Sequence, residues 1–192
     1  MTSATAKPRY ILCILLPIVF AGCSQPRDEP TVAAVDLLRI FDRAEKRPAS
    51  GFDVSSYELA GIPRPVIVAP VPSRAIWSLP VPHRGWFRAF VAADGPSAGQ
   101  VRVRVGVSDD RIYEGLTEAV LTPGAPHWVD IRADLSAYAG WKWSVFYHPD
   151  RTTWRIVLAS DPIGGTPATV MWGTPQLLTD TGSALEYASR RN

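Results

Sequence analysis

Short runs of β-type residues, separated by Pro, Gly and Asp, follow one another from Pro65 onward. The clearest run is 101–107, where valines alternate with polar or small residues, and 154–158 alternates in the same way around Arg155. Successive side chains of a strand point to opposite faces, so these runs predict strands with one buried face. The predicted strands cover 66–71, 75–79, 85–92, 100–107, 127–131, 141–148, 153–159 and 169–178. About eight strands at this spacing are typical of a mainly β sandwich or barrel.

Residues 31–48 have a helical period instead. Thr31 is available as an N-cap, Pro48 closes the segment, and the apolar residues between them recur on one helical face: Ala34, Leu37, Leu38, Phe41 and Ala44. We therefore expect a short N-terminal amphipathic helix that packs on a β-sandwich domain at 49–180, or alternatively docks a partner. Residues 181–192 are assigned as a C-terminal tail. With 46% hydrophobic and 20% charged residues, the chain has the composition of a globular protein.

The first 22 residues have the order of a signal peptide. Lys7 and Arg9 precede an apolar run at 10–20, and the small residues Ala21 and Gly22 follow it. An uncleaved anchor helix is the alternative. The run is interrupted by Pro17 and falls well short of the ~20 residues that a membrane-spanning helix needs. We favour cleavage and export.

Phe20-Ala21-Gly22-Cys23 resembles the lipobox of bacterial lipoproteins, with Phe20 in place of the usual aliphatic residue. The resemblance implies that Cys23 becomes the first residue and carries acyl chains into a membrane. Two or more chains give stable anchoring, whereas one gives only marginal binding. Residues 23–30 then form a polar tether that contains two prolines. Ser24 stands where an acidic residue often signals inner-membrane retention, so outer-membrane placement is expected if the source is Gram-negative.

Cysteine and charge exclude several classes of function for the exported part. Cys13 leaves with the signal and Cys23 is acylated, so no thiol remains for a disulfide, a nucleophile or a metal site. Lys7 and Arg9 leave as well, which reduces 20 basic residues to 18, equal to the 18 acidic ones. A net charge near zero gives no support for nucleic-acid binding.

Two stretches of the C-terminal half resemble galactose-binding-like jelly-roll domains of the carbohydrate-binding-module type. Residues 127–140 contain a tryptophan-led strand, an Asp-Leu-Ser turn and a Tyr-Ala-Gly turn, and Trp172-Gly173-Thr174-Pro175 is similar to the closing strand of such domains. The resemblance covers roughly 85–178. It implies a jelly-roll-like β-sandwich that binds a glycan or packs beside a separate enzyme.

No catalytic set is recognisable. The histidines His83, His127 and His148 have no metal-ligand spacing, and neither a Gly-x-Ser-x-Gly elbow nor a phosphate-binding loop occurs. We predict no metal and no cofactor. The carboxylates of the acidic segment are interpreted as turn and surface groups, with a glycosidase pair as the alternative: Asp109, Asp110, Glu114 and Glu118.

A basic, partly aromatic patch is the candidate binding site. Strand parity points four tryptophans inward, at 128, 143, 154 and 172, and points one set of side chains outward: Arg102, Arg104, Lys142, Phe146, His148 and Arg155. Arginine binds anionic oxygens through paired hydrogen bonds, so this patch suits an anionic glycan or a phosphorylated lipid headgroup. The alternative is a solvated outer face with edge-protecting charges.

The sequence therefore predicts a non-catalytic, membrane-anchored lipoprotein whose sandwich binds a glycan or an envelope partner. A structural or assembly lipoprotein without a small-molecule ligand, and a carbohydrate-active enzyme, are the alternatives.

Overall fold

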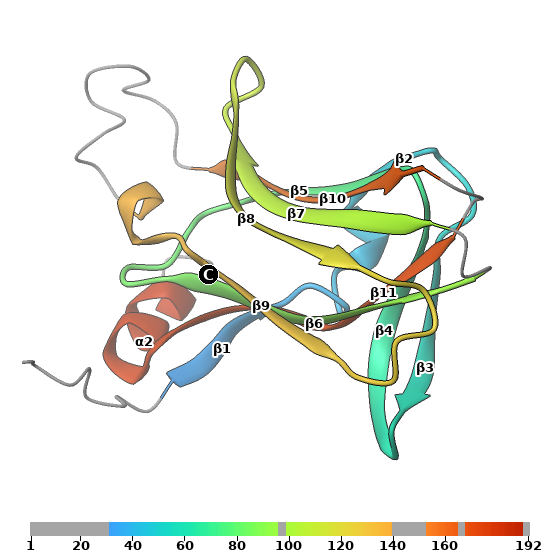
Figure 1. The fold of residues 1–192 in the computed structure, drawn as a ribbon. Helices are drawn as coiled ribbons and strands as arrows, with labels where there is room; N and C mark the ends of the chain where they lie inside the picture. The colour runs from blue at the N-terminus through green and yellow to red at the C-terminus, as the bar shows by residue number, and fades with distance from the viewer. Residues whose placement is uncertain (1–30, 96–98, 140–152, 165–167, 190–192) are drawn as a thin grey trace, which may run out of the picture.

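The computed structural model describes residues 31–95, 99–139, 153–164 and 168–189. Its strands form two layers that face each other (Figure 1). All the strand pairs between described residues are antiparallel. The predicted mainly β sandwich is confirmed.

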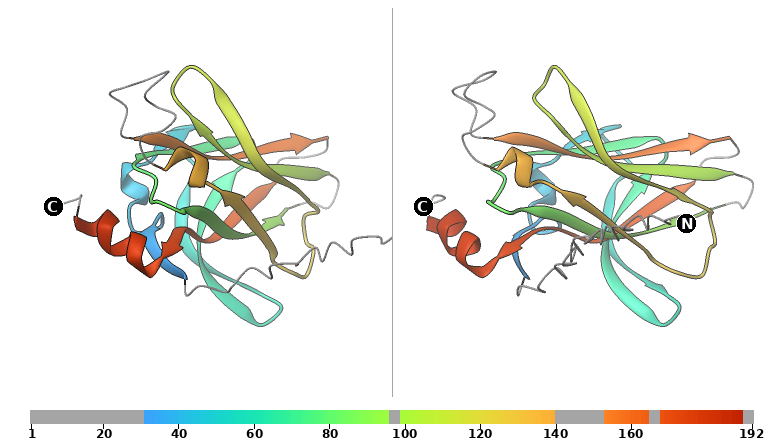
Figure 2. Two further views of the ribbon diagram at one scale, coloured as in Figure 1. Left: turned by 90° about the vertical axis from the view of Figure 1, so that its left-hand side faces the viewer. Right: turned by 60° about the vertical axis from the view of Figure 1, so that its left-hand side comes forward.

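We name the two layers sheet A and sheet B. The described strands of sheet A run in the order β3 (Asp53–Leu59), β4 (Ile62–Pro70), β11 (Thr169–Asp180), β6 (Trp86–Asp94) and β9 (Val129–Asp134), and β1 (Thr31–Asp36) pairs with β11. The described strands of sheet B run in the order β2 (Glu45–Arg47), β5 (Ser73–Leu79), β10 (Trp154–Ile163), β7 (Gln100–Ser108) and β8 (Tyr113–Leu121). Turned views separate the two layers (Figure 2).

The core lies between the sheets and follows the predicted alternation. The valines at 101, 103, 105 and 107 are each at most 2% exposed, and Ile156 and Leu158 are buried beside them. Phe87 of sheet A and Trp77 of sheet B fill the same interior. The Trp77 indole donates its Nε1 hydrogen to the carbonyl of Ile40 at 3.2 Å, which satisfies its one polar group.

The predicted helix at 31–48 is wrong. Residues 31–36 form β1, a turn follows, and the segment continues with the 3-10 helix η1 (Phe41–Arg43) and β2. The backbone of β1 pairs with the second half of β11, with Thr31 opposite Asp180, and an extended chain also carries Val35 and Leu37 into the core. Tertiary pairing therefore overrides the helical period, although the apolar residues do pack on the domain as expected.

The C-terminal segment is not a tail, because Thr181–Ser189 form the helix α2. Asp180 acts as its N-cap: its carboxylate accepts the Ser183 backbone N–H at 2.9 Å and the Ser183 hydroxyl at 2.8 Å. Tyr187 then anchors the helix by donating its hydroxyl to the carbonyl of Pro80. In the described part of the chain no helix is long and apolar enough to cross a membrane.

The tryptophans divide between the core and the surface. Trp172 is buried and Trp154 packs on the core, as predicted, while Trp143 lies outside the described residues. The inward prediction for Trp128 is wrong. It directly precedes Val129, which faces the core, so strand parity directs Trp128 to the outside of sheet A, against Val66 and Met171.

Candidate functional site

The three predicted arginines in the described part of the chain lie on the outer face of sheet B. Arg102 and Arg104 project from β7 and Arg155 from the neighbouring β10, as the alternation predicts. Lys142, Phe146 and His148 lie outside the described residues.

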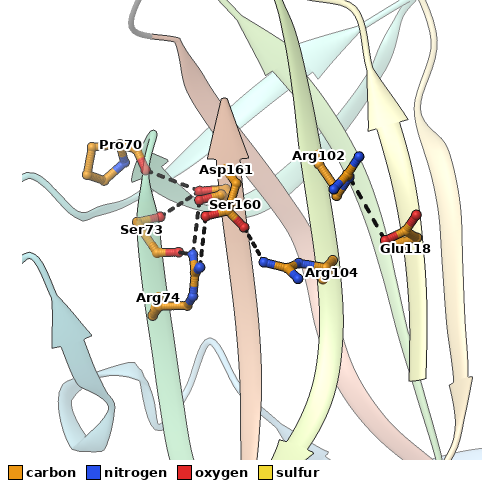
Figure 3. A network of polar contacts seen from close by, with 8 residues as sticks. All are labelled: Pro70, Ser73, Arg74, Arg102, Arg104, Glu118, Ser160 and Asp161. Carbon is orange, nitrogen blue, oxygen red and sulfur yellow. Dashed lines mark hydrogen bonds and ion pairs between the residues drawn. The ribbon is translucent and has the colours of Figure 1, made fainter. Parts of the chain in front are cut away.

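Asp161 is the centre of a polar network on this face (Figure 3). Its carboxylate accepts a hydrogen bond from Arg74 at 2.8 Å and one from Arg104 at 2.5 Å. Arg74 also donates to the carbonyls of Ser73 and Ser160. Burial alone raises the pKa of Asp161, but the hydrogen bonds and charges of the two guanidinium groups outweigh it and hold the pKa below its ordinary value. We call Arg74, Arg104 and Asp161 the Asp161 network.

The other two predicted arginines also pair with carboxylates. Arg155 donates to Asp110 at 2.6 Å and to Glu45, and so joins β2 to the turn between β7 and β8. Arg102 faces Glu118 at 4.0 Å, with both side chains well exposed. The structure thus brings the predicted arginines to one face, and internal carboxylates compensate each of their charges.

Tyr113 lies over Gly106 on the same face. A Cβ atom at Gly106 would come within 2.6 Å of the Tyr113 ring and within 2.3 Å of the Glu114 carbonyl, so only glycine permits this close approach. Burial raises the pKa of Tyr113, and the positive charges of Arg104 and Arg74 oppose this shift.

The acidic residues singled out in the sequence have surface and turn roles. Asp109 accepts the backbone N–H groups of Arg111 and Ile112, as expected for a turn residue. Asp110 and Glu118 form the ion pairs described above. Within the described ranges, no three His, Cys, Asp or Glu side chains are grouped to hold a metal ion.

A second candidate site lies on the outer face of sheet A and includes none of the predicted ligand-binding residues. The β3 and β4 strands form a long hairpin that extends beyond the sheet (Figure 1). Its two-residue turn, Ala60-Gly61, has positive φ at both positions and joins Leu59 to its partner Ile62. The register places Tyr57 opposite Arg64 on the outer face.

Trp128 packs against this hairpin from the other edge of sheet A. Its Nε1 hydrogen bonds to the carbonyl of Ile62 at 3.3 Å, and its ring meets Tyr57 edge to face, with 6.0 Å between ring centroids. Gly173 of β11 lies directly beneath Arg64 and Trp128. A Cβ atom at this position would come within 3.1 Å of Arg64 Cδ and 3.4 Å of Trp128 Cζ3. The missing side chain lets both residues pack down onto the sheet.

Arg64 stacks on Phe90 of β6, with 3.5 Å between the guanidinium carbon and the ring centroid, and lies 5.8 Å from the Trp128 ring. Its Nε is buried and has no hydrogen-bond partner. No carboxylate of the described residues forms an ion pair with it. Burial and the neighbouring charge of Arg88 lower the pKa of Arg64, while Asp130 acts in the opposite direction. We call Tyr57, Arg64, Phe90 and Trp128 the aromatic-arginine cluster.

Asp130 lies beside this cluster and resembles Asp161 of the other sheet. It accepts a paired set of hydrogen bonds from Arg88 at 3.0 and 2.9 Å, and Arg132 donates to it at 2.7 Å. Burial alone raises the pKa of Asp130, but the two arginines lower it overall. Arg88 also lies over the Phe90 ring at 4.7 Å.

Sequence reasoning missed this cluster because it began the strand at Val66 and left 53–64 unassigned. An alternating pattern was present on both sides of Ala60-Gly61, with Ser55, Tyr57 and Leu59 followed by Ile62, Arg64 and Val66. The turn pair lacks the Asn-Gly or Asp-Gly that marks such hairpins, and two prolines weaken the strand signal.

The sequence matches no protein-family model, and no curated protein matches it.

Several solved structures have a similar fold. A family 51 carbohydrate-binding module from Clostridium perfringens, in complex with methyl-galactose, is 12% identical, with a TM-score of 0.46 over 77% of this chain and 99% of its own. A β-1,3-glucan-binding module of family 6 from Bacillus halodurans is 12% identical, with a TM-score of 0.43 over 77% and 96%. A xylan-binding domain from Paenibacillus barcinonensis is 12% identical, with a TM-score of 0.45 over 72% and 86%. At these identities and scores the likeness assigns no ligand and no site to this chain.

Proposed function

We propose that this chain is a lipid-anchored exported protein whose sandwich binds a glycan, without catalysis, through the aromatic-arginine cluster. The observation that carries the proposal is the half-buried pair of rings, Trp128 and Tyr57, held edge to face on the outside of sheet A. Trp77 and Phe87, by contrast, are buried in the core, and the other edge-to-face pair of rings among the described residues, Tyr138 and Trp154, packs against that core rather than lying on an outer face.

The chemistry of the cluster suits a sugar. A pyranose ring presents apolar C–H faces and hydroxyl edges, and it needs a surface that offers both apolar rings and polar groups. Trp128 and Tyr57 offer ring surface, Arg64 offers hydrogen-bond donors, and the Asp130 pairs with Arg88 and Arg132 border the cluster with further polar groups. Internal contacts hold each of these side chains, so little ordering is needed on binding.

A glycan array with the full-length protein in detergent tests the proposal. Saturable binding of one glycan class is expected. Trp128→Ala should weaken it about tenfold or more, because stacking on the indole is lost. Arg102→Gln is the matched control, since it alters an exposed residue of sheet B and should leave the affinity unchanged. Thermal unfolding of both variants checks that the fold is retained.

The same experiment separates the alternatives. Binding that survives Trp128→Ala but is lost on Arg102→Gln or Arg155→Gln would move the site to the predicted patch on sheet B. No response to any glycan, together with recovery of one specific envelope protein, would favour the structural or assembly lipoprotein.

The membrane anchor is a separate part of the proposal and rests on the lipobox-like Phe20-Ala21-Gly22-Cys23. Cys23 is expected to carry a thioether-linked diacylglyceryl group and an amide-linked acyl chain. Mass spectrometry of the N-terminal peptide from the membrane fraction tests this. Cys23→Ser should release the protein from that fraction, and a free thiol at Cys23 in membrane-bound protein would refute the anchor.

A further inference from the structure

Arg64 differs from the other arginines that line the two outer faces. Each arginine of the Asp161 network, and each arginine beside Asp130, has a carboxylate partner within 3 Å. Arg64 has none among the described residues. Its Nε, like that of Arg104, is buried without a hydrogen-bond partner. Its terminal nitrogens donate to no described residue and are not among the fully buried atoms, so they remain available to a bound ligand.

The Arg64 guanidinium is also held in place. Phe90 supports one side of it at 3.5 Å, and its aliphatic stem lies in the space that Gly173 leaves open. A planar guanidinium in a fixed orientation offers two parallel N–H donors, a geometry that matches a carboxylate better than a hydroxyl or an ether oxygen.

The surrounding charge favours an anion. Arg64, Arg88 and Arg132 carry three positive charges around the single carboxylate of Asp130. Asp94 also acts on the cluster, because its charge adds to the effect of burial in raising the pKa of Tyr57. The cluster remains net positive, while the chain without its first 22 residues is neutral.

Resting on the glycan-binding function proposed above, we infer that Arg64 selects an acidic polysaccharide by pairing with the carboxylate of a uronate unit that stacks on Trp128. The cluster then recognises both the apolar face of the sugar and its negative charge. The rings of Trp128 and Tyr57 contact the apolar face of the sugar. The guanidinium of Arg64 favours a sugar that carries a carboxylate.

Polygalacturonate oligosaccharides and their methyl-esterified form are the probes for this inference, because the two share ring, linkage and length and differ in the charge of the carboxyl group. Isothermal titration calorimetry with the full-length protein in detergent is expected to give about tenfold tighter binding of the free acid. Raising the salt from 50 to 200 mM should weaken binding of the free acid and leave the ester unchanged.

Two variants of Arg64 assign the preference to this residue. Arg64→Gln should weaken the free acid about tenfold and the ester much less, so that the preference for the acid is largely lost. Thermal unfolding checks separately that the variant is folded. Arg64→Lys keeps the charge without the planar fork, and should therefore retain a reduced preference for the acid. Arg102→Gln, the control on sheet B, should preserve the full preference.

The outcomes distinguish this inference from the function on which it rests. Equal affinity for the acid and the ester, both lost in Trp128→Ala, would overturn the selection of a carboxylate and keep the glycan site. An acid preference that survives Arg64→Gln would also overturn it. Binding of a sulfated glycan above the uronate would overturn the carboxylate assignment. Absence of binding to every glycan would remove the function itself.

Discussion

The outer faces of the two sheets share one arrangement and differ in what surrounds it. On sheet B, Asp161 is held between Arg74 and Arg104, and on sheet A, Asp130 is held between Arg88 and Arg132. The two faces differ at one further arginine, Arg155 on sheet B and Arg64 on sheet A. On sheet B, Arg155 is paired with Glu45 and Asp110, whereas on sheet A, Arg64 is stacked on an aromatic ring and has no carboxylate partner in the described residues.

This comparison shows that an arginine's availability for a ligand depends on whether a neighbouring strand supplies a carboxylate partner. The pattern of 101–107 places Arg102 and Arg104 outward, and the structure agrees. Their partners come from β8 and β10, which approach β7 only in the folded sheet. The absence of a carboxylate partner for Arg64 among the described residues is therefore the reason to prefer the outer face of sheet A as the binding face.

Gly106→Ala, on sheet B, is expected to reduce the stability of the protein more than any other substitution proposed for the two outer faces, without affecting binding through sheet A. The new Cβ would come within 2.3 Å of the Glu114 carbonyl, which is backbone and has little freedom to move. Overpacking of this kind destabilises by about 2–3 kcal/mol. Urea unfolding measures the change, and a loss below about 0.5 kcal/mol would show that β8 can shift away from β7. Binding through sheet A, measured on the protein that stays folded, should be unaffected.

Asp161→Asn removes the shared negative charge of sheet B and one of its two acceptor oxygens. It should destabilise by about 1–2 kcal/mol at pH 7, because neither arginine keeps a hydrogen bond to a charged carboxylate. The pKa of Asp161 is lowered in the folded protein, so the stabilisation is present above the unfolded value of about 3.9 and is lost as pH falls through the folded value. Urea unfolding at pH 7 and pH 3 should therefore give a smaller difference from the wild type at pH 3.

Asp130→Asn is the matched change on sheet A. A loss of stability similar to that of Asp161→Asn would show that the two aspartates stabilise their sheets to the same extent. Only the sheet A variant should alter glycan binding. An equal effect of both variants on binding would contradict the assignment of the site to sheet A.

Gly173→Ala should have a smaller effect than Gly106→Ala. Its Cβ would come within 3.1 Å of the Phe90 carbonyl and of Arg64 Cδ, and the arginine stem can give way. We expect a destabilisation of about 0.5–1 kcal/mol. Displacement of Arg64 and Trp128 should at the same time lower glycan affinity severalfold, measured by calorimetry. Unchanged affinity would show that glycan binding does not depend on the close packing of Arg64 and Trp128 over Gly173.

Arg102→Gln should have the smallest effect. Its pair with Glu118 spans 4.0 Å between two exposed side chains, and such pairs contribute about 0–0.5 kcal/mol. A change of more than about 1 kcal/mol in urea unfolding would show that the pair does more than an exposed ion pair.

Several parts of the fold were readable before any tertiary information. The alternation at 101–107 and 154–158 gave the inward and outward residues of β7 and β10 correctly. The Asp-Leu-Ser segment is a turn, in which Asp134 accepts the Ser136 backbone N–H at 2.8 Å. The prediction of an N-terminal helix was wrong because pairing of β1 with β11 overrides the helical period there. The helix α2 was missed because its nine residues give only a short helical signal.

The sequence by itself determined the class of fold and which residues of the main strands face the core, because alternation is a local property of an extended chain. Only the tertiary structure decided which charges are compensated and which aromatic rings meet. Tyr57, Arg64, Phe90 and Trp128 come from four different strands or their approaches, and their contacts span up to 71 positions of the 192-residue chain. Such contacts depend on how the β3–β4 hairpin and β9 approach the outer face of sheet A, and local propensity carries no information about that approach.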